Sequence, residues 1–228
     1  MILAGANVAS QPRIRKILIV DDHAVMRQGL AKLLSDETDL QVCGEAENAP
    51  DALKAIGRLK PDLVIVDISL TGRTGIELIR DIRRDHPDVY VLVLSMHDET
   101  IYSDRALRAG ARGYIMKQEG GKVVVEAIRK VLAGQVYLSE KMTAKFFDRI
   151  SGGFRAADSP LEILSDREME VFQLIGDGLT TRQIAEQLCL SMKTVEVHRD
   201  HIKRKLSLKD GTALVRYAIR WAETEKIA

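Results

Sequence analysis

The sequence is poor in cysteine and in long apolar runs, and each shortage excludes a class of protein. Only two of the 228 residues are cysteines, and their spacing forms neither a C-x-x-C pair nor a metal-binding pattern. We therefore expect Cys43 and Cys189 to be small core residues in a reducing compartment rather than a disulfide. No apolar run approaches the roughly 18 residues of a membrane-spanning helix, so no membrane partner is expected.

The sequence also lacks an overall excess of either charge, since 34 basic residues face 33 acidic ones and the net charge is +1. A protein that coats nucleic acid by its overall charge is therefore excluded, and such binding would need a local basic patch. The length predicts two domains. Residues 1–13 lack the basic and apolar regions of a signal peptide, so we expect a disordered lead-in there.

Residues 14–135 alternate short β-branched runs with longer amphipathic stretches. Several runs are apolar at consecutive positions, which is typical of strands covered on both faces. Five strands alternating with five helices predict an α/β domain, a five-stranded parallel doubly wound sheet of the flavodoxin-like kind. The predicted strands are residues 17–20, 41–46, 62–67, 89–95 and 112–116.

The rhythm changes after this domain. Residues 136–160 place Met142, Phe146 and Ile150 on one helical face and then contain Gly-Gly and Ser-Pro breaks, which indicates a linker with a short helix. Residues 161–228 show four helical periods and no strand pattern, so an all-α domain of four helices is expected.

Capping residues mark where these helices begin. Two capping boxes, Ser165-x-x-Glu168 and Thr180-x-x-Gln183, open the first two helices, and Ser191 can cap the third. The fourth helix is expected from about residue 212 to residue 221.

Acidic side chains follow the first and third predicted strands. The stretch KILIVDDHAVMR runs from apolar residues into Asp21 and Asp22, and residues 62–67 end on Asp67. In a doubly wound sheet these two strand ends flank the switch point where ligands bind, so the three carboxylates should meet in one crevice. Paired buried acids are costly unless a cation neutralises them, and oxygen-only ligands suit Mg²⁺.

Two further polar groups point to the same place. Ser95 ends the fourth predicted strand and Lys117 follows the fifth. A carboxylate nucleophile, a divalent metal, a hydroxyl and an ammonium group together form a phosphoryl-transfer site, in which Asp67 attacks phosphorus to give an acyl phosphate. Singly, these residues are explained as a helix cap, a turn serine and a solvated lysine, but their joint occurrence at strand ends favours a site.

The motifs VDDH, VDISLTG, VLSMHDE and GARGYIMK resemble the receiver domain of bacterial two-component response regulators over roughly residues 14–135. The resemblance implies that Asp67 is the phosphoacceptor. It implies that Asp21 and Asp22 are the metal acids and that the Ser69 backbone carbonyl completes the Mg²⁺ site.

The same resemblance implies that Ser95 and Tyr114 are switch residues and that Lys117 contacts the phosphoryl group. Two positions depart from the family pattern, because Thr71 and Gln118 stand where proline is usual. The second departure leaves open whether the Lys117–Gln118 peptide is cis.

One predicted helix of the C-terminal domain concentrates positive charge. Residues 193–209 carry six basic side chains against two acidic ones, which favours a local phosphate-binding footprint over a merely solvated helix. The stretches LSDREMEVFQLI and IAEQLCLSMKTVEVHRDHIKRKL resemble the LuxR-type helix-turn-helix, and the combination with a receiver resembles the NarL/FixJ class. This implies a recognition helix over residues 192–206 in the major groove of double-stranded DNA.

Individual DNA contacts are carried over by position. The residues expected to face base edges are Glu196, Val197 and Asp200. Those expected to contact phosphates are Lys193, Thr194, His198, Arg199 and Lys203.

Together these features predict a cytoplasmic, DNA-binding transcription regulator that is switched by phosphorylation at Asp67. A sensor histidine kinase would be the phosphodonor, and the phosphorylated form would be a homodimer. The protein would not be classed as an enzyme. An aspartate-nucleophile phosphatase is disfavoured by Ser69, where a second acid is needed, and a LuxR-type quorum sensor by an aromatic content of 4%. A phosphate-independent regulator of the same architecture stays open as the alternative.

Overall fold

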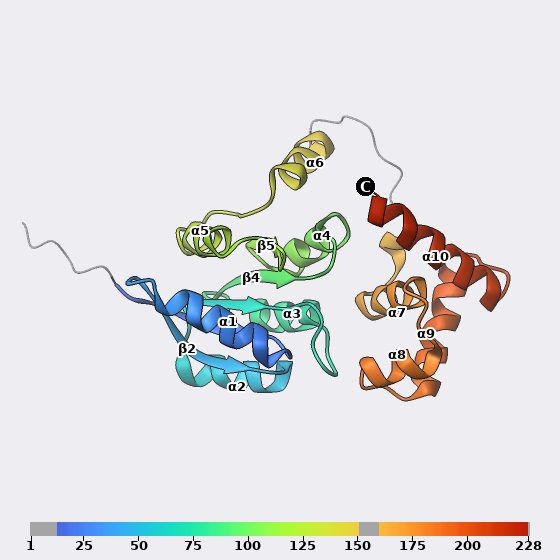
Figure 1. Ribbon diagram of the computed structural model, residues 1–228, viewed down its shortest axis with the longest axis horizontal. Coiled ribbons are helices and arrows are strands. Elements are labelled where there is room, and N and C mark those ends of the chain that lie inside the picture. Colours follow the sequence, from blue (N-terminus) through green and yellow to red (C-terminus); the bar gives the residue numbers. More distant parts are fainter. Residues whose placement is uncertain (1–12, 151–159, 228) are drawn as a thin grey trace, which may run out of the picture. The chain divides into compact units, whose positions relative to one another are not determined.

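The computed structural model describes residues 13–150 and 160–227, and the chain divides into two compact units (Figure 1). One unit is built on a five-stranded sheet and the other on the C-terminal helices. The lead-in expected over residues 1–13 lies outside the described residues except for Arg13, as does the linker segment 151–159.

The first unit contains the parallel sheet that the sequence predicts. Its strand order is β2-β1-β3-β4-β5, and every neighbouring pair is parallel. The predicted strands agree with the observed ones to within two residues at each end. The strands are β1 (Arg15–Val20), β2 (Leu40–Ala46), β3 (Leu63–Val66), β4 (Tyr90–Ser95) and β5 (Gly113–Met116).

Helices cover both faces of this sheet (Figure 1). One face packs on α1 (Ala24–Ser35) and α5 (Gly121–Leu132), where Ile17 and Ile19 belong to a continuous apolar cluster. The alternate residues Leu18 and Val20 are also fully buried, toward α2 (Ala49–Leu59), α3 (Gly75–Asp85) and α4 (Glu99–Ala109). Burial on both faces explains why β1 reads as a continuous apolar run rather than an alternating one.

The chain returns to the sheet edge after α5. Tyr114 N donates to Tyr137 O at 3.1 Å, and Tyr137 N donates to Arg112 O at 2.9 Å. A Cβ atom at Gly113 would lie 2.8 Å from Leu92 Cδ1 and 3.0 Å from Tyr137 O, so only glycine fits without displacement. Next comes α6 (Glu140–Ile150), the short helix expected in the linker, with Met142 buried.

Residues 160–227, in the second unit, form a short 3₁₀ turn and four helices of a helix-turn-helix arrangement. Both predicted capping boxes are present, and Ser191 caps the third helix through Thr194 N at 3.0 Å. Phe172 lies in the core with its ring 5.8 Å from that of Tyr217 and 5.4 Å from that of Trp221. The elements are η1 (Pro160–Ile163), α7 (Asp166–Gly176), α8 (Thr181–Gln187), α9 (Met192–Lys205) and α10 (Gly211–Ile227).

Two sequence-based expectations need correction. The last helix does not end near Trp221 but continues to Ile227, because Ala222 still packs in the core and the following polar residues are good helix formers. Cys189 is exposed rather than a core residue, because it lies in the turn after α8 with φ of 51°, outside the regular helix. Cys43 is half-buried on β2.

Among the described residues, no helix combines the length and the apolar character that crossing a membrane requires.

Candidate functional site

Two aspartates lie side by side where β1 and β3 end. The ladder continues one residue past the strands, because Asp67 N donates to Val20 O at 2.9 Å. This places Asp21 and Asp67, which are 2% and 3% exposed, next to one another at the carboxyl edge of the sheet. Asp22 and His23 follow directly. One ligand atom from each of these four residues lies within 4.8 Å of all the others.

Lys117 provides the buried countercharge. Its Nζ lies 2.6 Å from Asp21 Oδ2 and 2.7 Å from Asp67 Oδ2, and its side chain is only 4% exposed. Burial lowers the pKa of Lys117, but the two carboxylates outweigh it and the pKa is raised overall. Burial also raises the pKa of Asp67, although Lys117 acts against it. One ammonium group thus serves two buried acids, and negative charge remains.

This cluster fits a divalent metal ion. Asp67 Oδ1 is buried and finds no hydrogen-bond partner among the residues that the structure describes, which leaves a buried acceptor to be satisfied. Octahedral ligands about 2.1 Å from an ion lie at most about 4.2 Å apart, so the 4.8 Å spread requires only a small contraction. Ser69 lies two residues beyond Asp67 in the loop before α3.

The hydroxyl groups expected at the site are enclosed beside it. Ser95 is fully buried, and its hydroxyl accepts from His97 N at 3.3 Å. The Tyr114 ring is turned inward at 1% exposure, and its hydroxyl donates to His97 O at 2.7 Å. Burial raises the pKa of Tyr114 well above its usual value, so the phenol stays a donor. Ser95 and Tyr114 therefore both hydrogen-bond to His97, in the loop between β4 and α4.

The departures from the receiver pattern leave local geometry intact. The peptide bonds of the described residues are all trans, and this includes the bond between Lys117 and Gln118. The loop that contains Thr71 ends in a reciprocal cap, in which Thr74 Oγ1 accepts from Glu77 N and Glu77 Oε2 accepts from Thr74 N, both at 3.1 Å.

Sequence reasoning missed two residues of this site, His23 and Arg27. Arg27 is 7% exposed, and its Nη1 donates to the Asp21 backbone oxygen at 2.7 Å. It also binds Glu47 at 2.7 Å and Glu45 at 3.2 Å. Its spacing in the sequence could have indicated that Arg27 is buried, because it lies three and seven residues before Leu30 and Leu34, on the same face of α1.

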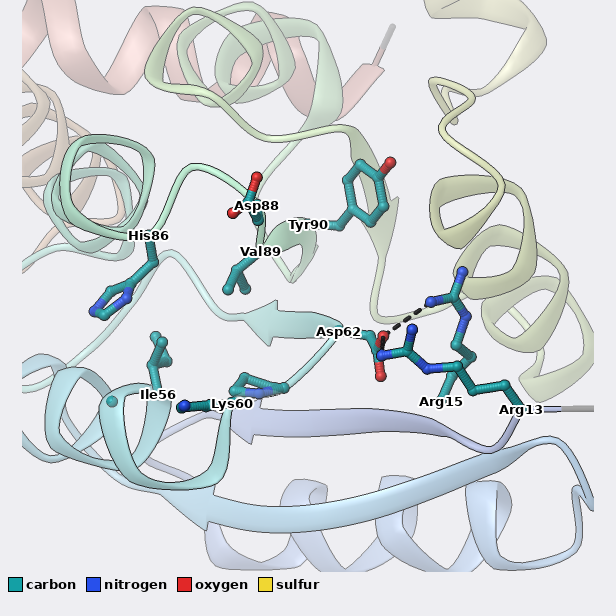
Figure 2. Close-up of a pocket in the computed structure, with 11 residues that line it drawn as sticks. Arg13, Arg15, Ile56, Lys60, Asp62, His86, Asp88, Val89 and Tyr90 are labelled. Atoms are coloured by element: carbon teal, nitrogen blue, oxygen red, sulfur yellow. Dashed lines mark hydrogen bonds and ion pairs between the residues drawn. The ribbon is translucent and has the colours of Figure 1, made fainter.

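A pocket of about 480 Å³ lies at the amino ends of β3 and β4, at the opposite end of the strands from the carboxylates (Figure 2). Arg13 and Arg15 both contact Asp62 there, at 3.2 and 2.8 Å. Its basic groups are thus partly neutralised within the pocket. His86 also lines it, far along the strands from the carboxylate cluster.

The predicted DNA-binding residues lie on α9, whose opposite face buries Val195 and Ile202. Lys193, Glu196, Val197 and Asp200 are exposed. Lys203 forms an ion pair with Asp200 at 2.7 Å.

Several members of that set also contact neighbouring side chains or are partly buried. Glu196 Oε1 accepts from Thr181 Oγ1 at 2.7 Å and Oε2 lies 3.9 Å from Arg199 Nε. The Thr194 hydroxyl hydrogen-bonds to Ser191. His198 is half-buried, and its Nδ1 has no hydrogen-bond partner within the described chain. Within this set, Lys193 and Val197 are therefore the exposed residues that take part in none of these contacts.

Two protein families match the chain. Residues 17–129 match the response regulator receiver domain, and residues 162–218 match the bacterial regulatory proteins of the luxR family. The chain is 37% identical over 210 residues to the oxygen regulatory protein NreC of Staphylococcus carnosus, covering 90% of this chain and 97% of NreC. It is 37% identical over 209 residues to the response regulator GacA of Pseudomonas aeruginosa, covering 90% and 95%.

Solved structures show the same likeness. RcsB of Salmonella typhimurium is 25% identical with a TM-score of 0.65, covering 91% of this chain and 98% of RcsB. RcsB has also been solved bound to the promoter rprA in the presence of the phosphomimetic BeF₃⁻. That structure is 25% identical with a TM-score of 0.61, covering 90% and 98%.

Proposed function

This chain belongs to the two-component response regulators that join a receiver domain to a LuxR-type DNA-binding domain and regulate transcription, and we propose that phosphorylation of Asp67 controls its binding to DNA. The observation that carries the proposal is the environment of Asp67. Its carboxylate is buried, contacts Lys117 through Oδ2 and keeps Oδ1 without a partner among the described residues.

In the proposed reaction, a carboxylate oxygen of Asp67 forms a bond to phosphorus while the bond from phosphorus to the donor's leaving group breaks. The residues that would hold Mg²⁺ are Asp21, Asp22 and Asp67, together with the Ser69 carbonyl. The ion would neutralise charge on the phosphoryl oxygens. Lys117, already within 2.7 Å of Asp67, can pair with the same oxygens, and the donor would be a sensor histidine kinase.

Ser95 and Tyr114 would carry the signal away from Asp67. Both are buried, and the Tyr114 hydroxyl already holds the loop after β4 through His97 O. A phosphoryl group that draws the Ser95 hydroxyl toward itself would favour this inward arrangement. We propose that the altered surface forms a homodimer, the commonest symmetric assembly, and that the dimer binds two half-sites of DNA. The cytoplasm is the compartment we propose, since the DNA partner is found there.

The domain limits we propose follow the same division. The receiver would comprise residues 14–135, the linker residues 136–160 and the DNA-binding domain residues 161–228.

The test compares the DNA affinity of the full chain with and without BeF₃⁻, using DNA selected from a random pool. A coupling between two sites typically changes affinity about 5- to 150-fold, and we expect an increase in that range. The Asp67→Asn variant is the control and should not respond. Equal affinity in both states, with occupancy of Asp67 shown by mass spectrometry or fluorine NMR, would favour a phosphate-independent regulator.

DNA contacts on α9 give a second expected result. Lys203→Ala should weaken binding to all sequences alike and lower the slope of log affinity against log salt by about 1, because one phosphate contact is lost. Glu196→Ala should instead change the preferred bases, since an exposed carboxylate on α9 can accept from a base amino group. Lys32→Ala, an exposed lysine on α1, is the matched control. Uniform weakening by both α9 changes would contradict the assignment of Glu196 to the groove.

A further inference from the structure

We propose that the imidazole of His23 is an additional ligand in the carboxylate cluster, and that it makes the cluster selective for first-row transition ions over Mg²⁺. The inference rests on the proposed function only in requiring that the cluster holds a divalent cation. His23 lies outside the three carboxylates of the proposed Mg²⁺ site. Its imidazole would give the site a metal preference that those carboxylates alone would not give.

The position of His23 is fixed by its backbone. It is the N-cap residue of α1, and its own N–H donates to Asp21 Oδ1 at 2.9 Å. This turn directs the ring back over the acids, so that Nδ1 lies 2.8 Å from Asp22 Oδ1 and 3.3 Å from Asp21 Oδ1. One nitrogen and three carboxylate oxygens thus lie within 4.8 Å of one another.

Burial differs across this cluster in a way that suits an ion. Asp67 Oδ1 forms the enclosed side, since it is buried and has no hydrogen-bond partner in the described part of the chain. The His23 side chain is 70% exposed and forms the open side. It can therefore adjust by rotation at little packing cost, which the 4.8 Å spread requires.

The chemistry of the ligands decides which ion gains from His23. Mg²⁺ prefers oxygen ligands and gives up its bound water reluctantly. An imidazole nitrogen therefore adds little to Mg²⁺ binding. Imidazole suits later first-row ions, whose affinity for nitrogen ligands rises from Mn²⁺ through Co²⁺ to Cu²⁺. The positive charge of Lys117 opposes any divalent ion equally and cancels from the ratio of two affinities.

The experiment measures Mg²⁺ and Co²⁺ binding to the full chain by calorimetry. His23→Ala should lower Co²⁺ affinity at least tenfold and change Mg²⁺ affinity by less than twofold. His86→Ala removes a histidine of the same unit at the other edge of the sheet and should change neither (Figure 2). Asp22→Asn should weaken both ions, which identifies the site. The visible absorption of bound Co²⁺ should also change in His23→Ala.

The outcomes separate the two proposals. Unchanged Co²⁺ affinity in His23→Ala, or an equal loss for both ions, would overturn the role of His23 while Mg²⁺ binding and phosphorylation stand. Failure of Mg²⁺ to support phosphorylation of the wild-type chain would overturn the proposed function, and the Co²⁺ titration would still decide the role of His23. A Co²⁺ site elsewhere in the chain would persist in Asp22→Asn and would also contradict the inference.

Discussion

The Asp67→Asn variant should take up no phosphoryl group under conditions in which the wild-type chain gains one. An amide is not a nucleophile, so substitution removes the bond-forming atom while keeping the shape of the side chain. Intact-mass measurement after incubation with Mg²⁺ and a small phosphodonor should show one acid-stable, base-labile group on the wild type only. Asp81→Asn, which changes another buried aspartate on α3, should be labelled normally.

The variant should also remain folded, which removes misfolding as an explanation. Burial raises the pKa of Asp67 above its unfolded value, so the carboxyl stabilises the fold at low pH and this contribution is lost as the pH rises through the folded pKa. The asparagine variant should therefore be at least as stable as the wild type at neutral pH without divalent ions, and its advantage should shrink on acidification. Labelling of Asp67→Asn at the wild-type stoichiometry would defeat the assignment of Asp67.

Lys117→Ala should destabilise the sheet-containing unit by about 3–5 kcal/mol in the absence of divalent ions, because breaking a buried ion pair leaves uncompensated charge. Here two carboxylates lose their shared partner, and the three side chains are each only 3–4% exposed. Hydrogen exchange of the β1 and β3 amides reports this unit directly. Added Mg²⁺ should restore part of the loss, since it supplies positive charge at the same carboxylates.

The matched control is Lys130→Ala. Lys130 is 46% exposed and pairs with Glu126 on the surface of α5, so its loss should change stability far less than the loss of Lys117. A similar small effect for Lys117→Ala would mean that Asp21 and Asp67 do not depend on Lys117 for their charge balance.

Local signals in the sequence were enough for most of the fold. The strands were predictable because helices cover both faces, so that runs such as residues 17–20 are apolar throughout. The helix starts at Ser165 and Thr180 were predictable because a capping box involves only four consecutive residues. Convergence of Asp21 and Asp67 followed from the topology, since parallel strands end at one edge.

The features that sequence reasoning missed depend on contacts between distant segments. Arg27 is held in place by three groups outside α1. These are Glu45 and Glu47, about twenty residues away, and the backbone carbonyl of Asp21. The place of His23 depends on the turn that begins α1, which the letters DDH do not reveal. Cys189 was misplaced because its apolar neighbours suggest burial, whereas the left-handed backbone at that position turns the chain.

The strand order also has a consequence for how the chain is made. After β1 and β2, each later strand adds to the same growing edge, β3 beside β1, β4 beside β3 and β5 beside β4. The sheet can therefore grow strand by strand in the order in which the strands are synthesised. Asp21 and Asp67 become neighbours as soon as β3 docks, but Lys117 follows β5 and arrives last. The sheet is therefore completed at the same stage at which Lys117 reaches these acids, and a nascent chain that stops before β5 carries two adjacent carboxylates without their countercharge.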